Sequence, residues 1–232
     1  MRLRFLARKT HKWLALTVGI QVLLWVVSGL YMTVIHIDYI HGDHLVKTLP
    51  PAVLADKRIA PLPDKVFRRY GQVSEIKLTV RLDKAVYLLT TEEGKIVLDA
   101  ASGDILNELD RDDISILAAK HYAGQATVVQ VRRLEQYPSE LGGRAQPIWE
   151  VAYDDWLAST LYFDVNSGRL AGKRSDLWRW FDFLWMLHIM DYETRDDINN
   201  SLLRVASILG FIMSISGLML VWYRLRPGSN KP

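Results

Sequence analysis

Two long stretches without charged side chains dominate the pattern of apolar and polar positions. The first runs from Trp13 to Ile35 and the second from Val205 to Tyr223. Each is about as long as a helix must be to cross the hydrocarbon core of a bilayer. We therefore predict two transmembrane helices, over residues 13–37 and 201–223, and the lipid bilayer as a partner.

Basic residues flank both predicted spans on the sides of the chain termini. They are Arg2, Arg4, Arg8, Lys9 and Lys12 before the first span, and Arg224, Arg226 and Lys231 after the second. Positive residues concentrate on the cytoplasmic side of a membrane. We expect cytoplasmic tails over residues 1–12 and 224–232. The net charge of +3 largely reflects these tails, so we expect no nucleic-acid partner.

The region between the spans, from about residue 38 to 176, alternates short apolar runs with charges, which is typical of one folded domain. Lys77, Thr79 and Arg81 alternate with apolar residues, the pattern of a strand with one wet face. The chain contains no cysteine. Disulfides, thiol catalysis, iron–sulfur clusters and covalently attached c-type haem are therefore excluded.

An internal repeat organises this domain. Val86–Gly103 aligns without a gap on Val151–Gly168, and both segments end in D-x-x-S-G. Further upstream, Lys65–Gln72 corresponds to Ala118–Gln125. We predict an α+β domain made of two units, about residues 58–106 and 110–171, each a helix followed by a three-stranded antiparallel sheet. S-G-D and S-G-R supply turns.

A helix followed by strands that end in a D-x-x-S-G turn resembles the PepSY domain family. The motifs T-H-K-W-L-A-L at the first span and W-M-L-H shortly before the second are similar to those of PepSY-associated transmembrane proteins. The resemblance covers nearly the whole chain. It implies a bacterial inner-membrane protein with a periplasmic domain of two PepSY-like repeats. Some larger relatives are reductases in siderophore iron uptake that use histidine-ligated haem, usually with four spans.

Histidines close to the spans are candidate cofactor ligands. With Trp13 at the inner edge, about twenty helical residues cover a core of about 30 Å, and His36 follows about one turn later. Trp178, Phe181, Trp185 and His188 share one face of an aromatic helix that we predict over residues 177–192, in the outer interface. One interpretation is a haem b with His36 and His188 as axial ligands. The other is that His188 only belongs to an amphipathic interface helix.

His11 lies at the opposite face of the membrane, about 37 Å from His36 along the helix. One iron therefore cannot bind both. A haem at His11 would need a second protomer or another subunit, and the alternative is that H-K-W is a membrane anchor. His41 and His44 could bind a divalent metal with Asp38 or His36, or could only shape the link into the domain.

Both spans contain the tripeptide S-G-L, at Ser28–Leu30 and Ser216–Leu218. Small residues let helices approach closely, which serves ordinary packing, a flat cofactor or a neighbouring subunit. No charged residue lies inside the two uncharged stretches, which argues against a proton-coupled transporter or ion channel. His121 is interpreted as a helix-end residue.

Two functions agree with these patterns. The first is an accessory or electron-transfer subunit, associated with haem, in a membrane redox or iron-uptake system. It would work as a homo-oligomer or with other membrane or periplasmic subunits. The alternative is a non-catalytic protein whose periplasmic domain binds a partner for regulation or assembly. The chain shows no recognisable catalytic motif, so we predict no catalytic residue and lean against an activity of its own.

Overall fold

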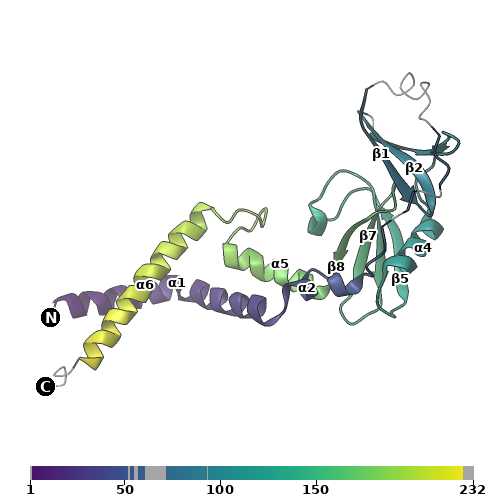
Figure 1. Cartoon of the computed structure of the whole chain (residues 1–232). Helices are drawn as coiled ribbons and strands as arrows, with labels where there is room; N and C mark the ends of the chain where they lie inside the picture. The colour runs from purple at the N-terminus through teal and green to yellow at the C-terminus, as the bar shows by residue number, and fades with distance from the viewer. Residues whose placement is uncertain (1, 52, 55–56, 61–71, 93, 227–232) are drawn as a thin grey trace. The chain divides into compact units, whose positions relative to one another are not determined.

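The computed structural model describes residues 2–51, 53–54, 57–60, 72–92 and 94–226 of the chain. The chain divides into two compact units. One comprises residues 1–40 and 177–232 and is called the helix unit below. The other, residues 41–176, is called the sheet domain. Figure 1 shows the long helices of the first and the two sheets of the second.

The helix unit contains two helices that are long and apolar enough to cross a membrane. They are α1 (Arg2–Val34) and α6 (Ser201–Leu225), and they contact each other. Only 11% of the most apolar part of α1 and 17% of that of α6 is buried. The core helix of a soluble protein would be mostly covered, so this exposure favours lipid contact. The shorter helices are α2 (Ile37–Ile40) and α5 (Asp176–Ile189).

The sheet domain contains two antiparallel sheets, each with its strands in chain order. The first consists of β1 (Val73–Arg81), β2 (Lys84–Thr91), β3 (Gly94–Asp99) and β4 (Ile105–Leu106). The second consists of β5 (Val128–Leu134), β6 (Ile148–Tyr153), β7 (Thr160–Asp164) and β8 (Leu170–Arg174). The prediction of three strands per sheet was wrong by one strand, because the chain reverses after each D-x-x-S-G turn and pairs again.

The main core of the domain lies between the second sheet and the helix α4 (Arg111–His121). Ile114 from α4 and Leu161 and Phe163 from β7 are fully buried there. Asp110 begins the helix with a capping box, since its side chain accepts from the Asp113 backbone and the Asp113 side chain accepts in return. The short helices η1 (Asp43–Leu45) and η2 (Ser139–Leu141) lie in the connections.

The first sheet has a smaller buried cluster, formed by Leu89 and Leu98 with partly buried neighbours. The helix predicted over Lys65–Gln72 lies, except for Gln72, outside the described residues. It therefore stays a prediction. The strand predicted around Lys77 is confirmed as β1, but its exposure does not alternate as predicted, since Ile76 is exposed and Thr79 and Arg81 are partly buried.

The two D-x-x-S-G turns share the same backbone hydrogen bonds to the aspartate side chain. In each, the aspartate Oδ1 accepts from the backbone N–H groups two and three residues later, at 2.8 and 3.0 Å for Asp99 and at 3.1 and 2.8 Å for Asp164. Gly103 and Gly168 close the turns with φ of 75° and 69°, where a side chain would be strained. The turns predicted from the motif are confirmed.

The alignment of the two segments without a gap was wrong. Asp99 pairs with Val86 across its sheet, and Asp164 pairs with Ile148. Asp164 follows Asp99 by 65 residues, whereas Ile148 follows Val86 by only 62. The β6–β7 connection therefore holds three extra residues. An odd shift moves every side chain of a strand to the other face, so the residue of β6 that corresponds to Val86 is Ile148 and not Val151.

Candidate functional site

Helix α5 is held against α1 by three side chains. Each donates to a backbone carbonyl of α5: Tyr31 to Leu177 (2.8 Å), Trp25 to His188 (2.7 Å) and Gln21 to Leu187 (2.9 Å). Leu187 and His188 belong to the last turn of α5, whose carbonyls have no partner within the helix, and apolar surroundings make this costly. The order of the contacts sets α5 antiparallel to α1 and fixes the position of His188. Its location in the outer interface stays a prediction.

His188 contacts a serine of α1. Its Nδ1 lies 2.6 Å from the Ser28 hydroxyl, and Ser28 is fully buried. That hydroxyl also lies 2.7 Å from the Leu24 carbonyl, which can only accept a hydrogen bond. When Ser28 donates its single proton to Leu24, its oxygen accepts from Nδ1–H of His188, and a neutral ring then has its lone pair on Nε2. The Trp185 ring stacks parallel to the imidazole at 6.4 Å.

His11 has the same arrangement against α6. Its Nδ1 lies 3.1 Å from the Met213 carbonyl and 3.2 Å from the Ser216 hydroxyl. Because a carbonyl only accepts, Nδ1 of His11 is the nitrogen that donates in this contact, and in a neutral ring the lone pair is then on Nε2. Gly217 makes room for the ring, since a Cβ there would lie 3.1 Å from His11 Cε1.

The two S-G-L tripeptides are therefore the places where histidines of other helices attach. Ser28 receives His188, and Ser216 receives His11. The sequence pattern identified both tripeptides and both histidines but did not pair them, because the partners lie 160 and 205 residues apart. One signal in the sequence could have suggested this pairing. Each span contains a serine followed by glycine, and another apolar helix supplies a histidine.

His36, the predicted axial partner of His188, has other contacts. It lies beyond the end of α1, and its exposed ring has Nδ1 3.4 Å from the Asp38 carboxylate. Ser28, where His188 attaches, precedes His36 by about 12 Å along a helical rise. The described contacts of His188 are with α1 and Trp185, and the pairing of His36 with His188 on one haem stays a prediction.

His41 and His44 lie on either side of Asp43, whose carboxylate is paired with Lys173. The hydrogen bond from Lys173 lowers the pKa of Asp43 below its ordinary value. In the described part of the chain, no three His, Cys, Asp or Glu side chains gather where they could hold a metal. The predicted metal site therefore lacks a third ligand there. His121 ends α4, as predicted.

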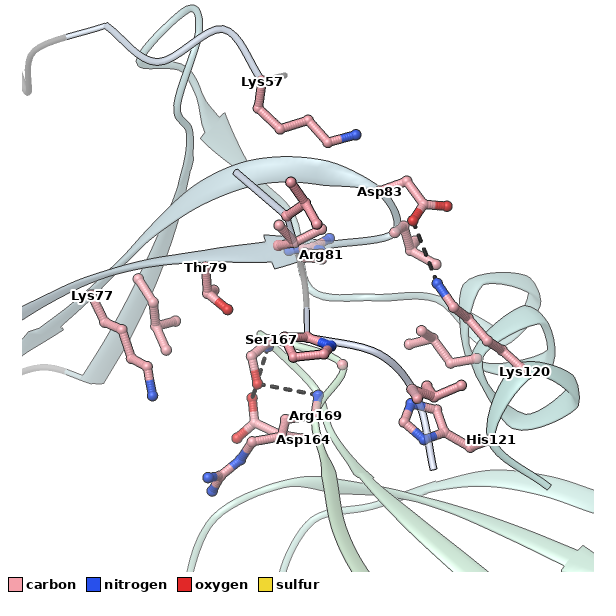
Figure 2. Close-up of a pocket in the computed structure, with 18 of the residues that line it drawn as sticks. Lys57, Lys77, Thr79, Arg81, Asp83, Lys120, His121, Asp164, Ser167 and Arg169 are labelled. Atoms are coloured by element: carbon pink, nitrogen blue, oxygen red, sulfur yellow. Dashed lines mark hydrogen bonds and ion pairs between the residues drawn. The ribbon is translucent and has the colours of Figure 1, made fainter. Parts of the chain in front are cut away.

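The sheet domain has a cleft of about 690 Å³ beside the first sheet. Figure 2 shows side chains reaching it from β1, from the end of α4 and from the second D-x-x-S-G turn. Its charged side chains are six basic residues, Lys57, Lys77, Arg81, Lys95, Lys120 and Arg169, and three acidic ones, Glu75, Asp83 and Asp164. The sequence analysis missed this cleft, because its residues come from segments far apart in the chain.

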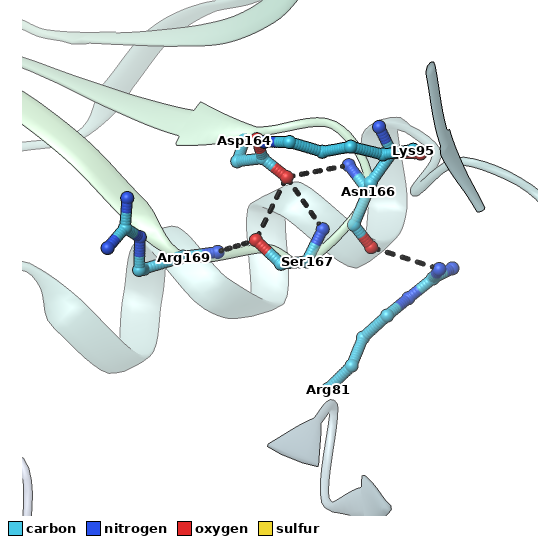
Figure 3. Close-up of polar contacts among 6 residues, drawn as sticks. All are labelled: Arg81, Lys95, Asp164, Asn166, Ser167 and Arg169. Atoms are coloured by element: carbon cyan, nitrogen blue, oxygen red, sulfur yellow. Dashed lines mark hydrogen bonds and ion pairs between the residues drawn. The ribbon is translucent and has the colours of Figure 1, made fainter. Parts of the chain in front are cut away.

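Asp164 and Arg81 line the cleft and form hydrogen bonds with the second D-x-x-S-G turn (Figure 3). The Asp164 carboxylate accepts from the Ser167 backbone and hydroxyl and pairs with Lys95 at 3.2 Å. Burial alone would raise the pKa of Asp164, but these contacts lower it below its ordinary value. Arg81 donates to the carbonyls of Asn166 and Asn107, at 3.1 and 2.7 Å.

Residues 8–231 match the family described as the PepSY-associated TM region. The chain belongs to this family. This PepSY-associated protein is therefore a membrane protein with a PepSY domain, and the resemblance stated from the sequence is confirmed. No curated protein and no solved structure matches the chain. The cytoplasmic location of both termini and the periplasmic location of the sheet domain stay predictions.

Proposed function

We propose that this protein is a haem-bearing electron-transfer subunit of a membrane redox or iron-uptake system. The observation that carries the proposal is the shared state of His11 and His188. Each ring is on an apolar helix and has its Nδ1 within hydrogen-bond distance of an oxygen of another helix, so the neutral form with Nδ1–H has its lone pair on Nε2. A neutral imidazole held in this way is the form that binds haem iron.

The residues fit haem b, which the chain would bind without cysteine. A hydrogen bond from Nδ1–H to an oxygen fixes the tautomer, orients the ring and makes Nε2 a stronger ligand. When bound, haem supplies one-electron chemistry. His11 and His188 would hold two separate groups, because His11 and Ser28 are about 25 Å apart along α1.

Each of the two proposed haem sites has one ligand from this chain, His11 in one site and His188 in the other. A second axial ligand would come from another protomer or subunit, which agrees with the expected homo-oligomer. His36 remains the alternative second ligand for His188. Substitution of His36 distinguishes the two arrangements. Only the second arrangement uses His36 as an iron ligand, whereas the first takes its second ligand from another protomer or subunit.

The absorption spectrum of the full-length protein, purified in detergent from haem-supplied cells, tests the proposal. We expect a Soret band and a reducible α-band, with about half of the haem lost in His188→Ala and about half in His11→Ala. His121→Ala is the matched control in the sheet domain and should bind as much haem as the parent. Loss of haem in His36→Ala would favour the His36–His188 pair. A protein without either band, both as isolated and after titration with haemin, would refute the proposal.

The glycines of the S-G-L tripeptides provide a second matched comparison. A Cβ at Gly217 would meet the His11 ring at 3.1 Å, whereas one at Gly29 would find no described atom within 4 Å. We expect Gly217→Val to reduce the haem content as His11→Ala does. Gly29→Val should leave it unchanged. Equal effects of the two substitutions would show that helix packing, not the position of His11, controls haem content.

Binding of a partner by the sheet domain is the second candidate function. The specific observation that favours it is the basic cleft beside β1, which belongs to a different unit from His11 and His188. The two functions are compatible in one protein, since they use different units.

A further inference from the structure

The cleft of the sheet domain has more positive than negative charge. Two of its acidic residues are already paired, Asp164 with Lys95 at 3.2 Å and Asp83 with Lys120 at 3.4 Å. The remaining charged lining consists of four basic residues, Lys57, Lys77, Arg81 and Arg169, and one acidic residue, Glu75. The cleft therefore has positive charge left for an anionic ligand.

Arg81 shows the imbalance most clearly. Its guanidinium is half-buried and donates to two backbone carbonyls, and no carboxylate of the described residues lies within ion-pair distance of it. Burial lowers the pKa of Arg81, because water that would stabilise the cation is excluded, and the Asp113 carboxylate offsets this only in part. A carboxylate entering the cleft would stabilise this charge.

The basic residues are distributed along the cleft. Lys57 precedes β1, Lys77 and Arg81 belong to β1, and Arg169 follows the second D-x-x-S-G turn (Figure 2). Apolar side chains lie among them, namely Leu49, Pro50, Val53, Leu82 and Leu88. A single small anion would meet one or two of these cations. An extended segment that mixes acidic and apolar side chains would meet the basic residues and the apolar surface together.

We propose that the cleft binds an extended acidic segment of a partner protein, with Glu or Asp side chains separated by apolar residues. The carboxylates contact Lys77, Arg81 and Arg169, and the apolar side chains cover Leu88 and Val53. This inference deepens the partner-binding function and rests on it. It is independent of haem, because the cleft and the two histidine sites belong to different units.

The test uses the full-length protein in an uncharged detergent and a short fluorescein-labelled peptide that alternates Glu with Val. Fluorescence anisotropy measures binding at low salt, and the Gln–Val peptide is the matched ligand control. We expect the Glu–Val peptide to bind and the Gln–Val peptide to bind much more weakly. Each water-exposed charge contributes a factor of about two to five, so Lys77→Ala with Arg169→Ala should weaken binding about 4- to 25-fold.

Lys84→Ala with Arg111→Ala is the matched control variant, because both residues are exposed basic residues of the same domain and neither lines the cleft. This double variant should bind the peptide as the parent does. Equal weakening by the two double variants would refute the cleft as the site. Displacement of the peptide by citrate or inorganic phosphate at matched ionic strength would also refute it, because the site would then be one for small anions. The haem spectrum of the same preparations tests the redox function separately.

Discussion

Replacement of Asp164 by alanine tests the contribution of the buried D-x-x-S-G turn to the stability of the sheet domain. The Asp164 side chain is 12% exposed and accepts three hydrogen bonds within its turn, from the backbone of Asn166 and from the backbone and hydroxyl of Ser167. It also pairs with Lys95 of the first sheet. Alanine would remove all four contacts and leave Lys95 without its partner.

Asp99 in the first turn is the matched control. It accepts only two backbone hydrogen bonds, from Ala101 and Ser102, and the described residues include no ion pair for it. Hydrogen bonds to a charged acceptor contribute about 1.5–3 kcal/mol when buried and less when exposed. We therefore expect Asp164→Ala to lower the free energy of unfolding by about 2–4 kcal/mol and Asp99→Ala by about 1 kcal/mol.

Thermal unfolding of the full-length protein in detergent, followed by the β-sheet signal in circular dichroism, measures both effects. For a domain of this size the Asp164 variant should melt roughly 6–14 °C below the parent. The pKa of Asp164 is lowered in the folded state, so its contribution is present above the unfolded pKa of about 4 and is lost as the pH falls further. The difference between the parent and Asp164→Ala should therefore shrink at low pH. Equal shifts for the two aspartates, or a difference that does not depend on pH, would refute this reasoning.

Two further predictions concern the same domain. A Cβ at Gly168 would lie 2.6 Å from Leu117 Cδ1 and 2.8 Å from Leu109 Cδ1, so Gly168→Ala should cost about 2–4 kcal/mol of unfolding free energy through backbone strain and overpacking. Gly142→Ala also has a positive φ but meets no described atom within 4 Å, so urea unfolding should show a loss of only about 1 kcal/mol; equal losses would contradict the packing argument. Burial, aided by Lys120, lowers the pKa of His121 below its unfolded value of about 6.5. The parent should therefore lose stability below about pH 6.5, where the unfolded state binds the proton more readily, and His121→Gln should reduce this loss in melting curves at pH 7.5 and 5; an unchanged pH dependence would contradict it.

Local features of the chain could be predicted because they depend on neighbouring residues. The uncharged stretches gave the two apolar helices, since length and hydropathy are enough for that inference. The D-x-x-S-G motif gave both turns, because the aspartate bonds to N–H groups only two and three residues away. The alternation around Lys77 gave β1 for the same reason.

The pairing of distant residues could not be predicted in this way. The three extra residues in the β6–β7 connection changed the register of a strand, which the repeated motif alone did not show. The cleft combines residues from β1, α4 and the second turn, and none of these segments signals a cleft separately.

The sequence by itself identified His11 and His188 as histidines of apolar helices and Ser28 and Ser216 as small residues of the two spans. Only the tertiary structure decided that His188 attaches to Ser28 and His11 to Ser216. The physical reason is that a serine hydroxyl and a helix carbonyl can hold either nitrogen of an imidazole. The side-by-side placement of helices far apart in the chain brings Nδ1, and not Nε2, of each ring to an oxygen of another helix.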